Sequence, residues 1–231
     1  MPVRRISFSF DEFYHLYSRG VDKRIIFLDD KDKKRFIRLL YVCNSIKPVV
    51  YKTIQGRALD EIETGEKLVA IGAYCLMPNH FHILVREIND GGIVKFMSKL
   101  LTAYSSYFNK KYERTGALFG SGFKAAHVDS DEYLKHMFAY IHMNPLKIIN
   151  QRWKSEKNDS EESLNFLKNY IFSSYPVYLN DNLEESYILN KNIFPVYFNN
   201  TKEWESSIRS WLDIESFETI QGRALDKTGD N

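Results

Sequence analysis

The 231-residue sequence predicts an α+β domain in which short strands alternate with amphipathic helices. Runs rich in apolar and aromatic residues, which are typical of strands, occupy residues 13–19, 68–76, 80–87 and 123–128. Between them, apolar side chains recur at helical spacing, which indicates helices that bury one face. With 44% hydrophobic and 27% charged residues, the composition is that of an ordinary globular protein with a sizeable core.

The first predicted strand leads into a helix. Gly20 makes a turn after the strand, and a second short apolar run follows at residues 25–28. Asp29 and Asp30 then open a helix that ends at Lys47-Pro48. The apolar positions that recur along this helix are Phe36, Leu39, Leu40 and Cys43.

The next two strands are joined by a turn at Pro78-Asn79, and a strong break follows the second of them at residues 89–92. A long helix from about Ile93 to Arg114 comes next. One stripe of this helix is apolar, as expected when a helix packs on a sheet. Its members are Met97, Leu100, Leu101, Tyr104 and Phe108.

A further helix follows the strand at residues 123–128. Asp129 and Glu132 have the spacing of a capping box, with Asp129 as the N-cap. We expect the helix to end near Met143, because Pro145 disfavours helical geometry at Asn144.

The pattern weakens after residue 150. A charged linker at residues 154–162 precedes a short helical stretch, the segment Ser173-Ser174-Tyr175 and a last amphipathic helix around 204–212. We therefore expect three parts: a domain that carries the site at 1–150, a helical extension at 151–218 and a disordered tail at 219–231.

Charge and cysteine content narrow the functional classes. The 32 Lys and Arg residues nearly balance 30 Asp and Glu, which argues against a general electrostatic affinity for nucleic acid but allows a local basic face. Cys43 and Cys75 are too few and too far apart for a disulfide framework or a cysteine zinc site. No signal-peptide core and no membrane-spanning apolar run are present, so we expect a cytoplasmic protein without a membrane partner.

One octapeptide, Thr-Ile-Gln-Gly-Arg-Ala-Leu-Asp, occurs at residues 53–60 and again at 219–226. Two copies do not make a repeat architecture. Either a mobile DNA repeat entered the gene twice, or the peptide itself serves a recognition function. Both copies are expected to be exposed, because each lies in a position that tolerates insertion.

The stretch around residue 80 holds the first candidate chemistry. Residues two apart in a strand project to the same face, so His80 and His82 would present two imidazoles side by side while Phe81 and Ile83 face the core. Two ring nitrogens suit one divalent metal. By itself this pair is weak, since two polar residues on a solvated strand face are commoner.

The last helix of the first part holds the second candidate chemistry. Tyr140 and Asn144 lie one helical turn apart and so share a face. A tyrosine can attack phosphorus and form a covalent ester, and an asparagine oxygen can complete a site for Mg²⁺ or Mn²⁺. The competing interpretation is that Tyr140 is a core aromatic, since it shares an apolar stripe with Met137 and Ile141.

Together these residues resemble the single-tyrosine HUH transposases, in which U is hydrophobic, and most of all the REP-associated tyrosine transposases. The resemblance covers about residues 10 to 180. Its two main motifs are Met77-Pro78-Asn79-His80-Phe81-His82-Ile83-Leu84-Val85 and Tyr140-Ile141-His142-Met143-Asn144-Pro145. Other matching pieces are Tyr17-Ser18-Arg19-Gly20, Gly116-Ala117-Leu118-Phe119, Phe123-Lys124 and Ser173-Ser174-Tyr175.

The resemblance implies a ferredoxin-like antiparallel sheet with helices on one face and the histidine motif on a central strand. It implies that His80, His82 and Asn144 bind Mg²⁺ or Mn²⁺, although relatives outside the subgroup often have Gln at the Asn position. Tyr140 becomes the nucleophile of a single-stranded DNA endonuclease and strand transferase that forms a 5′-phosphotyrosine on hairpin DNA. No nucleotide cofactor is expected, and the protein acts as a monomer or a homodimer.

Other tyrosines and histidines rank lower. Tyr104 falls on an apolar stripe, and Tyr107 and Tyr112 lack a suitably spaced Asn or Gln followed by Pro. His142 lies about 200° around the helix from Tyr140, given ~3.6 residues per turn, and is not counted as a ligand. Surface or satisfied polar roles are the default for His127 and His136.

Local basic residues are the candidates for binding the DNA backbone, although each could equally be an ordinary solvated charge. They are Arg4, Arg5, Arg19, Lys23, Arg24, Lys110, Lys111, Arg114 and Lys124. Two other classes of protein stay open: a rolling-circle replication initiator or relaxase that only nicks, and a domesticated DNA-binding protein that keeps the fold without catalysis.

Overall fold

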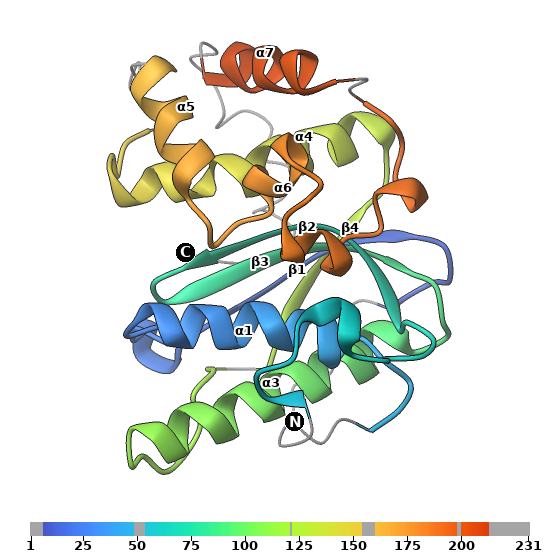
Figure 1. The fold of residues 1–231 in the computed structure, drawn as a ribbon, viewed down its shortest axis with the longest axis vertical. Coiled ribbons are helices and arrows are strands. Elements are labelled where there is room, and N and C mark those ends of the chain that lie inside the picture. The colour runs from blue at the N-terminus through green and yellow to red at the C-terminus, as the bar shows by residue number, and fades with distance from the viewer. Residues whose placement is uncertain (1–6, 49–53, 121, 154–159, 198–199, 213–231) are drawn as a thin grey trace.

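The computed structural model describes residues 7–48, 54–120, 122–153, 160–197 and 200–212. A four-stranded antiparallel sheet lies at its centre, between two layers of helices (Figure 1). The strands are ordered β2-β3-β1-β4, and their bounds are β1 Phe13–Arg19, β2 Val69–Met77, β3 His80–Glu87 and β4 Lys124–Val128. The predicted α+β class is confirmed.

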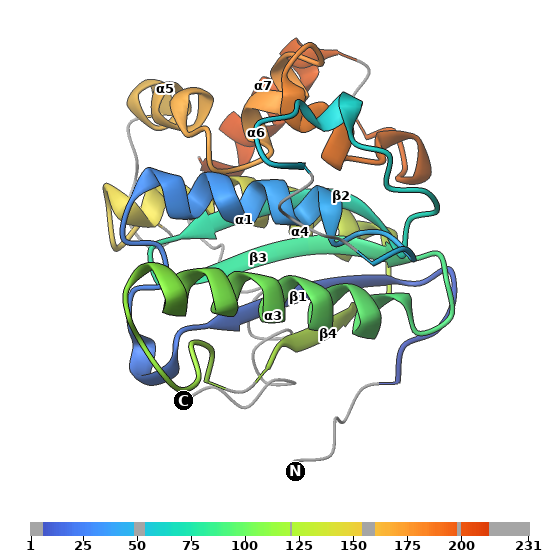
Figure 2. The ribbon, with the colours of Figure 1, turned by 60° about the horizontal axis from the view of Figure 1, so that its bottom comes forward.

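Two helices cover one face of the sheet. Helices α1 (Asp30–Val42) and α3 (Gly92–Lys111) lie side by side in front of the strands in Figure 2. The chain order β1-α1-β2-β3-α3-β4, with β1 and β3 in the middle of the sheet, is the ferredoxin-like arrangement expected from the resemblance. Strand β3, which carries the His80–His82 motif, is therefore a central strand, as predicted.

The opposite face of the sheet is covered by α4 (Asp131–Met143), so the expectation of helices on one face holds only for α1 and α3. The physical reason is that the sheet is apolar on both faces. Every residue of β2 is buried. Ala73 and Leu84 pack with Met137 and Ile141 of α4. A sheet that is apolar on both sides needs a layer on each to remove that area from water.

The C-terminal helices pack on the outer side of α4. They are α5 (Ser160–Asn169), α6 (Tyr175–Leu179) and α7 (Thr201–Leu212). Met143 of α4 joins Leu164, Trp204 and Ile208 in one apolar cluster. Short 3-10 helices occupy Val21–Lys23, Leu59–Glu61, Asn144–Ile148, Glu184–Ile188 and Lys191–Ile193. None of the helices in the described ranges has the length and apolar character needed to cross a bilayer.

Several predicted boundaries moved. Helix α1 begins after the Asp29 cap, as expected, but ends at Val42 rather than at Lys47. The apolar run at residues 25–28 is not a strand, because the Ile26 and Phe27 amides both donate to the Pro78 carbonyl instead of to a neighbouring strand.

The cap of α4 is Ser130, not Asp129. The Ser130 side chain accepts a hydrogen bond from the Tyr133 amide at 3.2 Å. With the cap moved by one residue, Glu132 no longer occupies the third helical position, where it would complete a capping box. The predicted end of this helix at Met143 is confirmed.

The outer edge of β2 is covered by the Ser173-Ser174-Tyr175 region. The Leu76 amide donates to the Phe172 carbonyl, and the Ser174 amide donates to the Tyr74 carbonyl, each at 2.9 Å. Further along the edge, the Asn190 amide donates to the Ile71 carbonyl at 2.8 Å. An edge strand left open would offer unpaired backbone groups to other chains, so the C-terminal region completes the sheet.

The first copy of the repeated octapeptide is only partly exposed, contrary to expectation. Ile54 and Leu59 are buried in the main core, whereas residues 55–58 between them are exposed. Two buried apolar side chains five residues apart thus anchor a loop whose middle faces solvent. The second copy, at residues 219–226, lies outside the described residues.

A buried carboxylate ties α1 to α3. Asp32 has no exposed surface, and it receives hydrogen bonds from the Leu28 amide at 2.8 Å, Tyr107 at 3.0 Å and Tyr112 at 2.8 Å. Lys111 Nζ lies 2.7 Å from Asp32 Oδ1. A buried charge is tolerated only when it is paired and hydrogen-bonded in this way.

We therefore predict that Asp32→Asn destabilises the fold by about 2–4 kcal/mol, because it leaves the Lys111 charge without its buried partner. Urea unfolding measures the change. Asp30→Asn is the matched control: Asp30 pairs with Lys33 at 3.2 Å, but its side chain is 68% exposed, and a surface pair contributes less than about 1 kcal/mol. If both variants lower the free energy of unfolding equally, the buried cluster stabilises the fold no more than a surface ion pair does.

Candidate active site

The two histidines of the motif project from the start of β3 toward α4. His80 and His82 lie on one face of the strand, with ring centroids 5.0 Å apart and ring planes at 88°. Phe81 and Ile83 point the other way and are fully buried in the core beneath α1 and α3. The period-two alternation of a strand thus gives the arrangement predicted from the sequence.

Tyr140 of α4 lies beside this pair. Its ring centroid is 5.6 Å from that of His82, with the two planes at 80°, and the side chain is only partly buried. The fold therefore brings together, within a single chain, the ring of Tyr140 and the histidine pair to which His82 belongs.

Asn144 follows Tyr140 by one turn, and the backbone N–H of Asn144 donates to the Tyr140 carbonyl. Its side chain is 3% exposed, and Nδ2 finds no hydrogen-bond partner among the described residues. Lys147, three residues further on, is close enough to His80 to lower the pKa of that imidazole. Asn144 therefore lies, along the chain, between Tyr140, which contacts His82, and Lys147, which is near His80.

These residues fit a divalent metal in their chemistry. The described residues contain no group of three or more His, Cys, Asp or Glu that could hold an ion, so a third protein ligand here would come from another type of residue. The Asn144 amide suits this role, because turning it by 180° puts Oδ1 where the unsatisfied Nδ2 lies. Oxygen and imidazole donors together are compatible with Mg²⁺ or Mn²⁺.

Burial keeps His80 neutral, which is the form that binds a metal. Desolvation, together with the nearby charges of Arg19 and Lys147, lowers the pKa of His80 to about 3. At neutral pH the ring therefore carries one proton and one lone pair.

His15 is a polar residue of the site that sequence reasoning missed. It lies on β1, and its Nε2 is 2.8 Å from Nδ1 of His82, with the two ring planes at 19° and their centroids 5.0 Å apart. Burial lowers the pKa of His15 to about 3. Strand alternation alone could place His15 on one face of β1, but only the β1–β3 pairing brings that face to His82.

The remaining histidines are engaged in packing or hydrogen bonds that hold the fold together. His142 is buried and its Nε2 lies 2.7 Å from Ser174 Oγ, so it ties α4 to the edge of β2; burial lowers its pKa to about 3. His127 Nε2 lies 2.9 Å from a Glu12 carboxylate oxygen. His136 is buried between the rings of Tyr140 and Trp211.

The rival tyrosines lie on α3 or, for Tyr112, at its C-cap, on the other side of the sheet. Tyr104 is fully buried and donates to the Ile26 carbonyl. Tyr107 and Tyr112 donate to the carboxylate of Asp32. Each hydroxyl is thus committed to a structural hydrogen bond, away from the histidine pair.

Two of the predicted DNA-binding residues lie at the histidine end of the sheet. Arg19 is exposed and lies directly opposite His80 in the β1–β3 register. Lys124 lies opposite Tyr17 in the β1–β4 register, with its Nζ 6.0 Å from the centre of the Tyr17 ring. Together with Lys147, which the sequence analysis did not single out, they place positive charge around the site.

The other predicted basic residues lie elsewhere or are engaged in the fold. Lys23 and Arg24 are in the loop after β1, where the Lys23 carbonyl accepts a hydrogen bond from Asn79. Lys111 pairs with Asp29 and Asp32, and Arg114 donates to Asn109 at 2.9 Å. Lys110 is exposed at the end of α3. Arg4 and Arg5 lie outside the described residues.

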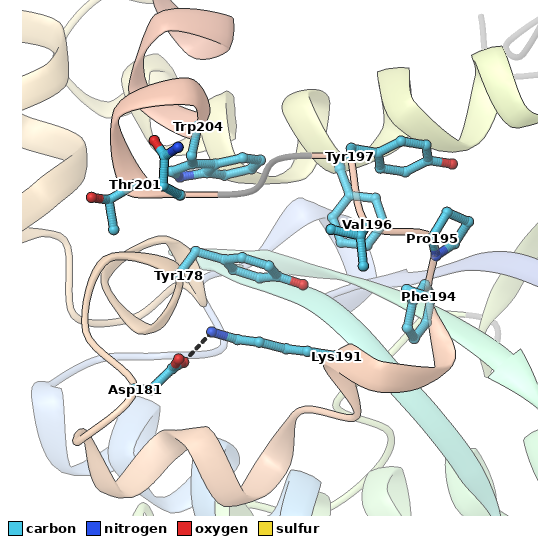
Figure 3. Close-up of a pocket in the computed structure, with 11 residues that line it drawn as sticks. Tyr178, Asp181, Lys191, Phe194, Pro195, Val196, Tyr197, Thr201 and Trp204 are labelled. Atoms are coloured by element: carbon cyan, nitrogen blue, oxygen red, sulfur yellow. Dashed lines mark hydrogen bonds and ion pairs between the residues drawn. The ribbon is translucent and has the colours of Figure 1, made fainter.

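A separate cavity of about 270 Å³ lies among α4, α6 and α7 (Figure 3). Aromatic rings of Phe138, Tyr178 and Trp204 line it, together with the Lys191–Asp181 ion pair. Phe138 and Tyr140 lie about 200° apart around α4, given ~3.6 residues per turn. The cavity is therefore on a different side of α4 from the histidine pair.

Comparison with known proteins gives a family match over part of the chain. Residues 34–144 match the family model described as "Transposase IS200 like", so the resemblance predicted from the two motifs is confirmed. The matched segment includes His80, His82, Tyr140 and Asn144. A solved structure of a REP-associated tyrosine transposase bound to a REP hairpin is 12% identical, with a TM-score of 0.45; the match covers 86% of this chain and 91% of that chain. Among curated proteins, none matches this chain.

Proposed function

We propose that this chain, which resembles the IS200-like transposases over residues 34–144, is a metal-dependent endonuclease and strand transferase that acts on single-stranded, hairpin-forming DNA. The observation that carries the proposal is the position of Tyr140 beside His82, with ring centroids 5.6 Å apart within one chain. A nucleophile next to a pair of metal-binding imidazoles is the minimum that phosphodiester cleavage of this type requires.

In the proposed reaction, the Tyr140 hydroxyl loses its proton and its oxygen attacks the phosphorus of a phosphodiester. A bond forms between Tyr140 Oη and phosphorus, the bond from phosphorus to the 3′ oxygen breaks, and the departing oxygen takes up a proton to become a 3′-hydroxyl. The product is a 5′-phosphotyrosine. Because this ester retains the energy of the broken bond, a 3′-hydroxyl of another strand can reverse the step, and no nucleotide cofactor is needed.

His80, His82 and Asn144 would hold one divalent ion, Mg²⁺ or Mn²⁺. When bound, such an ion supplies Lewis-acid polarisation of the non-bridging phosphate oxygens. Tyr140 is only partly buried on α4, and its ring packs edge-to-face on that of His82. All four residues belong to one chain, so a monomer contains a complete set.

The proposed DNA path passes the histidine end of the sheet. Arg19, Lys124 and Lys147 supply positive charge there for the phosphate backbone. Tyr17, partly exposed beside Lys124 and 6.2 Å from His82 between ring centroids, offers a surface on which an unpaired base can stack. The hairpin form of the substrate follows from the family resemblance.

Tyr140→Phe is expected to abolish the covalent protein–DNA adduct, because it removes the attacking oxygen but keeps the ring that packs on His82. The measurement is a denaturing gel of labelled single-stranded hairpin DNA incubated with protein and Mn²⁺. Tyr133→Phe is the matched control: Tyr133 is also partly buried on α4, and the variant should form the adduct at the wild-type level.

Persistence of the adduct in Tyr140→Phe would exclude Tyr140 as the nucleophile. Two other outcomes would point to the competing classes. Nicking without strand transfer between hairpin-flanked substrates favours a replication initiator or relaxase. Absence of cleavage by the wild type with every divalent metal tested favours a domesticated DNA-binding protein.

The double variant Arg19→Gln and Lys124→Gln should weaken binding of single-stranded DNA and flatten its salt dependence. Each phosphate contact contributes about −0.7 to the slope of log affinity against log salt concentration for a single strand, so the expected change is about 1.4. Fluorescence anisotropy at several salt concentrations measures the slope. Lys95→Gln, an exposed lysine of α3, is the control, and an equal change there would show a non-specific effect of net charge.

A further inference from the structure

The two candidate metal ligands share one feature: Nδ1 of each ring is hydrogen-bonded to a protein side chain. His80 Nδ1 lies 2.6 Å from Asn79 Oδ1. His82 Nδ1 lies 2.8 Å from His15 Nε2. In a neutral imidazole one nitrogen carries the proton and the other the lone pair, and the partner of one nitrogen decides which form is present.

At His80, the hydrogen bond to Asn79 allows only one tautomer of the ring. The Asn79 amide is held in one orientation, because its Nδ2 donates to the Lys23 carbonyl at 3.0 Å. Its oxygen therefore faces His80, and an amide oxygen can only accept. Nδ1 of His80 must carry the proton, so the lone pair that can bind a metal is on Nε2.

At His82 the partner is another imidazole, so two arrangements are conceivable. Either His82 Nδ1–H donates to His15 Nε2, or His15 Nε2–H donates to His82 Nδ1. Only the first arrangement puts the lone pair of His82 on Nε2. In the second, the lone pair of His82 is on Nδ1 and accepts the hydrogen bond from His15, while Nε2 carries the proton. No nitrogen of His82 could then bind a metal.

The position of His15 is unusual for a residue with only a structural role. It lies on β1 between Phe13 and Tyr17 on the same face, is 7% exposed, and packs against the ring of Tyr140 at 6.1 Å between centroids. An apolar or aromatic side chain would fill this aromatic setting without the cost of burying polar nitrogens, which is roughly 1–3 kcal/mol when they are not fully satisfied.

We propose that His15 and Asn79 set the tautomers of His82 and His80, so that both metal ligands present Nε2 to the same divalent ion. His15 is a positioning residue that acts through His82: it accepts the Nδ1 proton, and this hydrogen bond between two nearly parallel rings fixes the plane of the His82 ring. The inference rests on the proposed function, since it presumes that the two rings bind a metal. Outer partners of this kind typically contribute about 10–100-fold to metal affinity.

Two measurements test this. The first is long-range ¹H–¹⁵N correlation NMR of the wild-type, metal-free protein, which reports the protonated nitrogen of each histidine. The account predicts that His80 and His82 both carry the proton on Nδ1. A His82 ring protonated on Nε2 would overturn the inference, and this measurement needs no variant that must fold.

The second measurement is the affinity for Mn²⁺ alone, followed by the electron paramagnetic resonance signal of the free ion. His15→Phe keeps the shape of the ring but removes the acceptor, and its Kd for Mn²⁺ should rise about 10–100-fold with little loss of thermal stability. His15→Gln, whose amide oxygen can accept the same proton, should recover most of the affinity. His127→Phe changes a histidine of the edge strand β4 that is bonded to Glu12, and this variant should bind Mn²⁺ as the wild type does.

The failures of the two proposals are distinguishable. If the wild type binds Mn²⁺, His80→Ala does not, and His15→Phe binds as tightly as the wild type, then the role of His15 is overturned while the metal site stands. If the wild type and His80→Ala give the same Mn²⁺ signal, the metal site of the proposed function fails, and the role of His15 fails with it.

Discussion

The docking of α4 on the second apolar face of the sheet is the contact on which the candidate site depends. Leu84 of β3 and the small residues of β2 pack against Met137 and Ile141 of α4. Burial of this apolar surface, rather than any polar bond, fixes how far α4 lies from the sheet. Tyr140 is carried by the same helix and therefore comes to rest beside His82.

The C-terminal region supports this docking from the outer side. Trp204 of α7 packs edge-to-face against His142 at 5.0 Å between ring centroids, and His142 is bonded to Ser174, whose backbone covers the edge of β2. Helix α4 is thus held between the sheet and a second layer of helices. The residues of the candidate site lie in the first part of the chain, while some of the residues that hold α4 in place lie after residue 150.

What the sequence could predict was local in origin. The shared face of His80 and His82 follows from strand alternation, and the pairing of Tyr140 with Asn144 follows from one helical turn. What could not be predicted depends on contacts between distant segments. His15 reaches His82 only through the pairing of β1 with β3, and Lys147 approaches His80 only because α4 docks as it does. The layer on the second face was missed for the same reason, since alternation shows which residues face away from α1 and α3 but not what covers them.

The central claim is that one chain builds the whole site, with the Tyr140 of its own α4 acting on phosphate held at its own histidines. It is tested most directly by mixing two inactive proteins, Tyr140→Phe and His82→Ala, in equal amounts with single-stranded hairpin DNA and Mn²⁺. The account predicts that no covalent adduct forms, because neither chain contains both the nucleophile and the metal ligands. An adduct restored on mixing and carried by the His82→Ala chain would contradict it, since Tyr140 of one chain would then have acted at the histidines of another.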